Sequence, residues 1–405
     1  RWLAVLLAVG MLLAGLRVFP LLGLEFTPRL NEGDLIVNLT MAPSISLEEC
    51  KRLTLIAARR MMQIPEVDSV VSRIGGGEVG AHADPINSVH ALVVLKSVEA
   101  WRPSIDQAAV EAELRERLAG MPGVFVNLTQ PIQLTVDELV GGVKAELAVK
   151  LYGDDLNVLK QHADEIAAVL NSLRGAKDVQ TEQITGSPQL LIRPKRAALA
   201  RYGINLGEVQ ETIRAAIGGV TVGQVFDGVR RFDIYVRYQE AYRRTAEDVG
   251  HLLITAPGGQ RVPLAELASI KTLVGPRQIT RENNQRFATV QANIVGRDIG
   301  GFVAEAQAAI EREVELPPGY LISWGGQFEL AQQANQRLAL VVPITLGLIF
   351  LLLYSSFGSI KNTLLILLNI PLALVGGVIS LWLLGENLSV PASVGFIALF
   401  GIALT

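Results

Sequence analysis

Several residue types are scarce in this 405-residue sequence, and each scarcity excludes a class of protein. Cys50 is the single cysteine, so an intrachain disulfide is excluded. Acidic residues slightly outnumber basic ones, and the net charge of -3 gives no basic surface of the kind that binds nucleic acid. No nucleophile stands beside a general base in a recognisable motif, so the sequence carries no signal for an enzyme.

Long apolar runs are abundant instead. Hydrophobic residues make up 50% of the chain and charged residues 19%, as expected when membrane helices dilute a soluble domain. Four runs are predicted to span a membrane, where a helix needs about 20 residues: 2–24, 338–357, 363–384 and 388–404. A signal peptide is the alternative for 2–24, but that run is longer than the usual apolar region of about 7–15 residues and lacks a small-x-small cleavage site.

Charges in the short connections predict the orientation of these spans. Arg1 precedes the first run and Lys361 lies between the second and third, whereas the connection Gly385-Glu386-Asn387 is acidic. Lys and Arg favour the cytoplasmic side of short loops. Arg1 and Lys361 are therefore expected inside, and Glu386 and the large segment 25–337 outside. Because the first residue is not Met and the last run ends while still apolar, we expect the chain to be part of a longer protein.

The large segment reads as two copies of one mixed pattern. Strand and helix periodicity predicts the order β-α-β-β-α-β, the split βαβ arrangement, and Ser46 followed by Glu49 predicts a capping box at the first helix. The second copy has strands at 146–151, 178–184, 189–193, 287–294 and 320–324. A β-rich stretch with a Gly218-Gly219 turn interrupts it. A solenoid is disfavoured because the units are too long and too few.

The fold class is therefore predicted to be an α+β membrane protein, with ferredoxin-like units and an inserted subdomain. The predicted domains are a membrane helix at 1–24, a first unit at 25–142, a second unit at 143–197 and 282–337, the insert at 198–281, and three helices at 338–405, the last incomplete.

One group of candidate metal ligands lies in a single stretch. His82, Asp84 and His90 fall within nine residues, in and just after the loop that follows Gly75-Gly76-Gly77. Imidazole and carboxylate groups ligate divalent ions, but the spacing matches no recognised ligand pattern and the loop is rich in Gly and Ala. An ordinary surface loop is the favoured interpretation, and a metal site is the alternative.

A series of short motifs resembles the second half of a resistance–nodulation–division efflux pump of the heavy-metal (CzcA/CusA-like) branch. Each motif is weak by itself, but together they follow one another in register along the whole chain. They are Phe26-x-Pro28, Asn31-Glu32-Gly33-Asp34, Pro43-x-Ile45-Ser46, Ile64-Pro65-Glu66-Val67, Gln130-Pro131-Ile132-Gln133, Val136-Asp137-Glu138-Leu139, Gly218-Gly219-x-x-Val222-Gly223-Gln224, Trp324-Gly325-Gly326-Gln327-Phe328-Glu329 and Gly395-Phe396-Ile397-Ala398-Leu399-Phe400-Gly401.

The resemblance implies the seventh to tenth helices of a twelve-helix proton antiporter in the bacterial inner membrane. The large segment would then form periplasmic porter subdomains, with the insert 198–281 as a docking subdomain. Expected partners are a periplasmic adaptor and an outer-membrane channel, in a homotrimer, with no cofactor beyond the transported metal and the proton motive force. Family members take up protons on their fourth helix, outside this chain, and none of the four apolar runs contains Asp, Glu or His.

The same resemblance implies a metal site at Asp137 and Glu138, on the segment that joins the two units. In the family, the cleft between such units carries the substrate. Adjacent residues on an extended backbone point to opposite faces, so at most one faces the cleft. We expect Glu138 to be the ligand and Asp137 an anchor behind it, with Glu182 facing them from the second unit. The alternative is that Glu138 only forms a salt bridge near the hinge, to Lys144.

The scarcity of sulfur favours divalent ions of the zinc, cobalt and cadmium type. Copper(I) and silver(I) prefer thioether and thiolate sulfur. The five methionines lie off the cleft segments, and Thr221 stands where a sulfur ligand would be expected. A copper or silver exporter remains the alternative. A multidrug pump is a second alternative, although the low content of aromatic residues, 6%, argues against it. A membrane-anchored periplasmic binding or sensor module is a third alternative. The methionines are Met11, Met41, Met61, Met62 and Met121.

Overall fold

The computed structural model describes residues 2–28, 31–76, 84–276 and 278–404. The chain folds into two compact units, Thr185–Arg277 and the remainder, Arg1–Ile184 with Gln278–Thr405. Arg1 and His82 lie outside the described residues.

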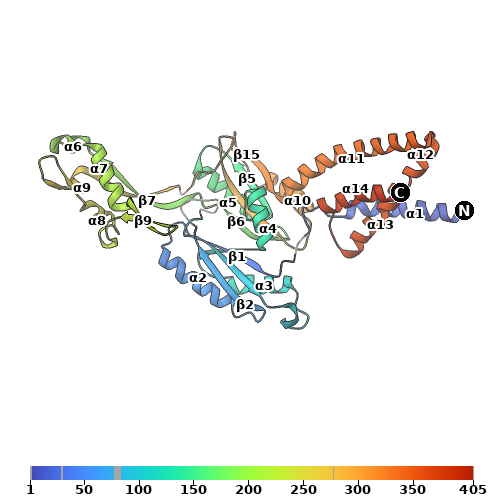
Figure 1. The fold of residues 1–405 in the computed structure, drawn as a ribbon, viewed down its shortest axis with the longest axis horizontal. Coiled ribbons are helices and arrows are strands. Elements are labelled where there is room, and N and C mark those ends of the chain that lie inside the picture. Colours follow the sequence, from blue (N-terminus) through green and yellow to red (C-terminus); the bar gives the residue numbers. More distant parts are fainter. Residues whose placement is uncertain (1, 29–30, 77–83, 277, 405) are drawn as a thin grey trace. The chain divides into compact units, whose positions relative to one another are not determined.

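A four-stranded antiparallel sheet with two helices on one face forms the first part of the larger unit (Figure 1). Its strand order, β2-β3-β1-β4, is that of a split βαβ unit. Alternate residues of β1, among them Val37 and Leu39, are fully buried with α2 and α3, and the intervening residues face the other way. The elements are β1 (Leu35–Met41), α2 (Leu47–Met61), β2 (Val67–Ile74), β3 (Ser88–Leu95), α3 (Gln107–Leu118) and β4 (Val124–Thr129).

The start of α2 follows the predicted cap in part. The Ser46 hydroxyl accepts a hydrogen bond from the Glu49 N–H at 3.2 Å. The Glu49 carboxylate does not return to the Ser46 backbone but forms an ion pair with Arg52, three residues further along the helix. Half of the capping box is therefore present.

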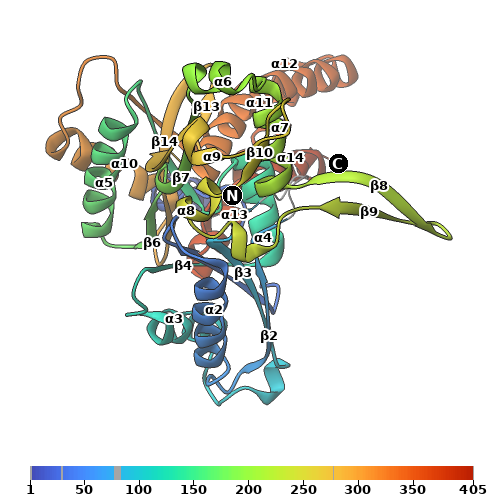
Figure 2. The ribbon, with the colours of Figure 1, turned by 90° about the vertical axis from the view of Figure 1, so that its left-hand side faces the viewer.

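The second sheet repeats the topology. Strands β15, β5, β14 and β6 lie in that order, and α5 and α10 cover one face (Figure 2). The strand predicted at 189–193 is not part of this sheet, because it pairs with β12 in the smaller unit. The elements are β5 (Leu147–Tyr152), α5 (Leu156–Ser172), β6 (Ala176–Thr181), β13 (Arg281–Glu282), β14 (Gln285–Ile294), α10 (Ile299–Glu313) and β15 (Leu321–Gly326).

The smaller unit, Thr185–Arg277, has its own core and three two-stranded sheets. It begins before the predicted insert, since β7 forms a long antiparallel ladder with β12. A separate hairpin, β8–β9, has no buried residue. The elements are β7 (Thr185–Pro194), α6 (Arg196–Tyr202), α7 (Leu206–Ile213), β8 (Val220–Asp227), β9 (Arg230–Val236), α8 (Ala246–Gly250), β10 (Leu253–Thr255), β11 (Arg261–Pro263), α9 (Leu264–Leu267) and β12 (Ala268–Pro276).

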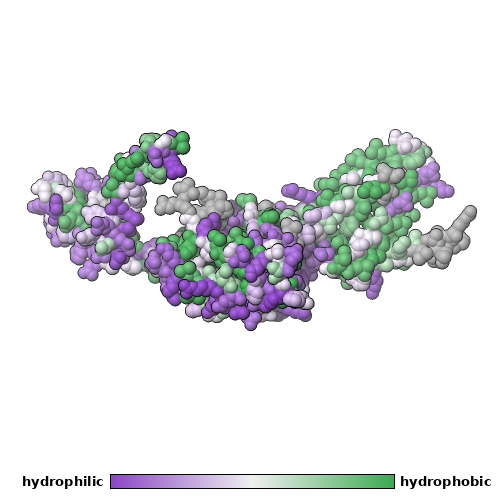
Figure 3. Space-filling model, turned by 60° about the horizontal axis from the view of Figure 1, so that its bottom comes forward, coloured by the Kyte–Doolittle hydropathy of each residue, from purple (hydrophilic) through white to green (hydrophobic). Residues whose placement is uncertain are grey.

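The apolar runs form helices that belong to the larger unit. By length and composition, two helices among the described residues can cross a membrane, Gln327–Phe357 and Ile360–Leu384, and Ala8–Leu21 and Val390–Ile402 are shorter apolar helices. Figure 3 shows apolar side chains over the exposed surface of these helices. The elements are α1 (Trp2–Val18), α11 (Gln327–Phe357), α12 (Ile360–Leu367), α13 (Asn369–Leu384) and α14 (Val390–Leu404).

Strand β15 passes directly into α11, and Gly326 makes this possible. Its backbone has φ +77° and ψ −151°, a conformation that is essentially restricted to glycine. A Cβ atom at this position would lie 2.6 Å from the carbonyl oxygen of Glu146. The strand and the long helix are therefore joined rigidly.

Gly326→Ala should lower the stability of the protein by about 1–3 kcal/mol, because the new methyl group meets backbone atoms in a strained conformation. The midpoint of thermal unfolding in detergent measures this change. Gly347→Ala is the control, since a Cβ there meets nothing within 4 Å and the residue is helical. Equal midpoints for the two variants would contradict the prediction.

Candidate functional site

A row of polar side chains crosses the first sheet on the face opposite α2 and α3. Arg73 of β2 pairs with His90 of β3, His90 with Asn38 of β1, and Asn38 with Asn127 of β4. Residues that pair directly across strands share one face of the sheet. The row Arg73–His90–Asn38–Asn127 is therefore one continuous polar strip on a sheet whose other face is apolar.

Asn38, in the middle of this strip, is the exceptional member. Its side chain is 6% exposed, and neither its amide nitrogen nor its amide oxygen has a hydrogen-bond partner among the described residues. An unsatisfied buried polar group costs about 1–3 kcal/mol, so such a group calls for a ligand or water that satisfies it. Asn38 was not among the site residues predicted from the sequence. The available signal was a lone amide in the otherwise apolar run Leu35-Ile36-Val37-Asn38-Leu39.

Four charged or ionisable groups gather around His90, toward the Arg73 end of the strip, and we call Asp84, His90, Glu138 and Lys144 the Asp84 cluster. The Lys144 ammonium lies 2.8 Å from Asp84 Oδ1, 3.1 Å from His90 Nε2 and 3.6 Å from Glu138 Oε1. His90 Nε2 is also 2.9 Å from Asp84 Oδ2. Arg73 adds a longer contact to Asp84, at 3.6 Å.

The Asp84 carboxyl is ionised at neutral pH. Its hydrogen bond to His90, and next that from Lys144, hold the pKa of this carboxyl well below its usual range, although burial opposes them. A carboxylate, a second carboxylate from Glu138 and an imidazole are the donors that borderline divalent ions accept. The cluster unites residues from the 84–90 stretch, which the sequence suggested as a loop, with Glu138.

The other end of the strip joins the two sheets. Asn293 of β14 donates through Nδ2 to Asn127 Oδ1 at 2.7 Å and to Asp178 Oδ2 at 3.0 Å. Asp178 also accepts from the Arg115 guanidinium of α3 at 3.0 Å. All three side chains from Asn127, Asn293 and Asp178 are at least nine-tenths buried. This network fixes the first sheet against the second.

The segment that joins the sheets is helical, which corrects the expectation of an extended backbone at Asp137. Helix α4 (Pro131–Val136) continues into a π-helical turn, Asp137–Gly141, which ends at Gly142 with φ +67°. Asp137 and Glu138 still point in different directions. Glu138 contacts Lys144, as in the salt-bridge alternative, whereas Asp137 is buried and accepts from Gln327 Nε2 at 3.1 Å.

Asp137 has an unusual environment for a carboxyl group. Its Oδ2 is buried without a hydrogen-bond partner in the described part of the chain. Burial, followed by the nearby carboxylates of Glu146 and Glu138, raises the pKa of Asp137 to about 7, against the opposing hydrogen bond from Gln327. A carboxyl that holds its proton near neutral pH is a weak metal ligand, so this geometry suits an anchor between the joining segment and the first residue of α11.

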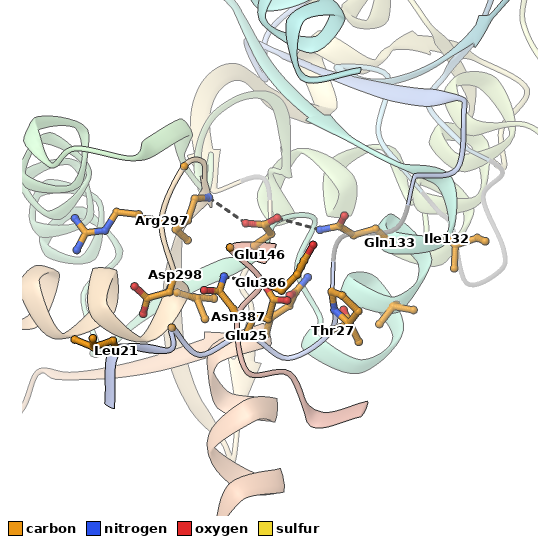
Figure 4. A pocket seen from close by; sticks show the side chains of 18 residues that line it. Leu21, Glu25, Thr27, Ile132, Gln133, Glu146, Arg297, Asp298, Glu386 and Asn387 are labelled. Carbon is orange, nitrogen blue, oxygen red and sulfur yellow. Dashed lines mark hydrogen bonds between the residues drawn. The ribbon is translucent and has the colours of Figure 1, made fainter. Parts of the chain in front are cut away.

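A cavity of about 760 Å³ lies close to this anchor, and Figure 4 shows its lining. Glu146 points into it and accepts from Gln133 Nε2 at 3.2 Å and from the Ile294 N–H at 3.1 Å. Three more carboxylates line it, from the exit of α1, the start of α10 and the α13–α14 connection: Glu25, Asp298 and Glu386.

Glu182 follows β6, and its carboxylate has local partners. Oε1 accepts from the Thr280 hydroxyl at 2.9 Å and Oε2 from the Thr289 N–H at 3.2 Å. The structure does not bring Glu182 together with Asp137 and Glu138 as metal ligands. Within the described residues, no group of three or more His, Cys, Asp or Glu side chains is placed to hold a metal ion as it stands.

Comparisons with known proteins agree with this architecture over the whole chain. The model of the AcrB/AcrD/AcrF family matches residues 1–405. The chain belongs to this family. It is therefore a member of a family of membrane transporters, and its relatives include heavy-metal efflux pumps of the resistance–nodulation–division type.

Among the relatives of this pump family, the cobalt-zinc-cadmium resistance protein CzcA of Cupriavidus metallidurans is 41% identical over 95% of the chain. The cation efflux system protein CusA of Escherichia coli is 34% identical over 94%. A crystal structure of a heavy metal efflux pump superposes with a TM-score of 0.86 over 99% of the chain, at 36% identity, and the chain covers 42% of it. The chain spans 37% of the length of CzcA and 36% of that of CusA.

The raised pKa of Asp137 predicts a pH-dependent stability. The folded protein binds the proton of this carboxyl more tightly than the unfolded chain does, where the ordinary pKa is 3.8. Its contribution is therefore complete below about pH 4 and is lost as the pH rises through about 7. Asp137→Asn, which is neutral at every pH, should flatten this decline in thermal-unfolding midpoints measured from pH 4 to 8.

Asp164→Asn, on the exposed face of α5, is the matched control and should keep the wild-type profile. If the Asp137→Asn profile matched that of the wild type, the carboxyl would not be held protonated.

Proposed function

We propose that this chain is part of a proton-driven exporter of heavy-metal cations, the inner-membrane component of a tripartite efflux system. Membership of the pump family supports the transport role. The names of relatives at 40–41% identity, which concern cobalt, zinc, cadmium and nickel, support metal ions as the substrate class. The proton-relay residues are proposed to lie outside this chain.

The observation that carries the proposal is the polar strip and the Asp84 cluster at its end. Asn38 is buried with both amide atoms unsatisfied by the described residues, and Asp84, His90 and Glu138 converge on one cation. Arrangements of this kind are costly in a protein core unless a ligand uses them. We assign Glu138, His90 and Asp84 as ligands of the transported ion, with Asp137 as anchor and Glu182 as a weaker candidate.

The donor set favours divalent ions of the zinc, cobalt or cadmium type. The proposed ligands are oxygen and nitrogen atoms, which these ions accept, whereas copper(I) and silver(I) prefer sulfur. The sulfur atoms of Met41 and Cys50 lie in the apolar core on the opposite face of the sheet. Divalent metals therefore fit the site better.

Replacing the ligands should reduce metal resistance. Glu138→Ala and His90→Ala should each lower tolerance of zinc, cobalt or cadmium in growth assays. Each should weaken metal binding by at least about 10-fold, the loss typical of a residue that only supports a ligand, because each removes a donor itself. Asp137→Ala and Glu182→Ala should have smaller effects. His162→Ala is the control, since His162 pairs with Glu165 within α5. Unchanged tolerance in all four variants of the site would place the ligands elsewhere.

The proposed location is the bacterial inner membrane, with the large segment in the periplasm. The exit of α1 pairs with the α13–α14 connection through Leu24 and Leu388, so these two turns lie on one side. Lys361 lies at the start of α12, beyond the far end of α11 (Figure 1). This arrangement fits the orientation in which positive loops stay in the cytoplasm.

A reporter that is active only in the cytoplasm tests this orientation. Fused at the exposed turn Gly258-Gly259, it should be inactive, whereas a fusion next to Lys361 should be active. Activity at the Gly258-Gly259 turn would overturn the periplasmic assignment.

For partners, we propose a homotrimer that binds a periplasmic adaptor and an outer-membrane channel through the smaller unit. The β8–β9 hairpin supports this role, because its apolar side chains are exposed, including Phe226, Val229 and Phe232. Exposed apolar surfaces of this kind mark protein interfaces.

A further inference from the structure

The Lys144 ammonium occupies the point on which the proposed metal ligands converge. Three donor atoms surround it, from Asp84 at 2.8 Å, His90 at 3.1 Å and Glu138 at 3.6 Å. The three come from different parts of the fold: the segment before β3, β3 itself and the π-helical turn. Zinc bonds to such donors are about 2.0–2.2 Å long, so a metal ion would draw in the same side chains by about 1 Å or slightly more.

Charge balance favours one cation at a time in this site, either the Lys144 ammonium or a metal ion. The carboxylates of Asp84 and Glu138 are matched by Lys144 and by Arg73, which lies 3.6 Å from Asp84. A divalent ion added beside Lys144 would face the positive charge of the ammonium at a few ångströms, and the two charges would repel each other in this partly buried site. The ion therefore binds best where the ammonium has left.

The contacts of His90 show the same conflict. Its Nε2 atom is 2.9 Å from Asp84 Oδ2 and 3.1 Å from Lys144 Nζ. One ring nitrogen carries either a proton or a lone pair, so it satisfies one of these contacts at a time. When it accepts from Lys144, its lone pair is directed at the ammonium, as imidazole directs it at a coordinated metal.

The Lys144 ammonium can leave the site without unfolding the residues around it. Its backbone carbonyl is held by Asn127 Nδ2 at 2.6 Å, which ties the main chain to the polar strip. Its side chain is 29% exposed and has a flexible four-carbon stem. The ammonium can thus swing toward solvent while the backbone stays in place.

We propose that Lys144 is a tethered counter-cation of the metal site: a divalent metal ion replaces its ammonium between Asp84, His90 and Glu138, and the ammonium returns when the ion leaves. This inference rests on the proposed metal-export function. It adds a competitor within the protein, which weakens binding and favours release of the ion. The inference also accounts for the absence of a ready-made metal group within the described residues.

Zinc affinity of the purified membrane protein tests the competition. Lys144→Gln keeps the length and polarity of the side chain but removes its charge, and should bind Zn²⁺ about tenfold more tightly in a dye-competition titration. Lys150→Gln is the matched control, because Lys150 is a partly buried lysine paired with Glu282 outside the site, and its affinity should equal that of the wild type. Equal or weaker Zn²⁺ binding by a folded Lys144→Gln protein would overturn the proposal.

A second measurement uses the wild-type protein and does not depend on a variant. Zn²⁺ should increase the modification of Lys144 by an amine-reactive reagent, read by mass spectrometry, because the displaced ammonium enters solvent. Lys160, in an exposed ion pair with Asp164, should react equally with and without Zn²⁺. Unchanged or reduced modification of Lys144 on saturation with Zn²⁺ would contradict displacement.

His90→Ala separates this inference from the function on which it rests. If His90→Ala weakens Zn²⁺ binding while Lys144 neither competes nor changes its reactivity, the metal site stands and the counter-cation is wrong. If the wild type and His90→Ala bind Zn²⁺ equally, the metal site itself is wrong, and the inference fails with it.

Discussion

The amide of Asn293 is the contact on which the geometry of the larger unit depends. It joins Asn127 of the first sheet to Asp178 of the second, in a place where all three side chains are buried. Asp178 adopts a left-handed backbone, with φ +54°, and its carboxylate accepts from Arg115. Removing one partner of a buried charged network leaves the others unsatisfied, which is more costly than the contact is worth in isolation. The two sheets are thus held in one relation to each other.

Asn127 connects this junction to the proposed site through its hydrogen bonds. The same side chain that accepts from Asn293 donates to the Lys144 carbonyl, so the junction also positions the backbone of the joining segment. Further along, Asp137 holds Gln327 at the start of α11, and Gly326 joins that helix to β15 without a flexible linker. The joining segment is therefore connected by short polar contacts to a helix that runs into the apolar region.

The sequence predicted elements better than it predicted their partners. Strand patterning and the Ser46 cap placed β5, predicted at 146–151, and the start of α2 closely, because local patterning decides both. The segment 189–193 was recognised as a strand, but its pairing with β12 depends on contacts some 80 residues away. Asp137 was expected on an extended backbone because no residue pattern in Val136-Asp137-Glu138-Leu139 indicates a π-helical turn. The burial of Asp137 against Gln327, 190 residues later, depends on tertiary contacts.

The candidate site could not be predicted fully from the sequence because its residues are brought together by strand register. His90 and Asn38 are 52 positions apart, and only the antiparallel pairing of β1 with β3 makes them neighbours. The sequence favoured a surface loop around Asp84 because no ligand spacing was visible, since the proposed ligands are spaced across strands and not along the chain. Lysine is not among the residues of the usual metal-ligand motifs, so no search for such motifs would have placed Lys144 in the site.

Lys144 contributes to the proposed site through its positive charge. Without a cation, the two carboxylates brought together beside the imidazole would repel each other and lose hydration. In the proposed site, the ammonium would therefore stabilise the ligand set in the absence of metal, and the same charge would limit how tightly the ion is held, which suits an exporter that must release its cargo.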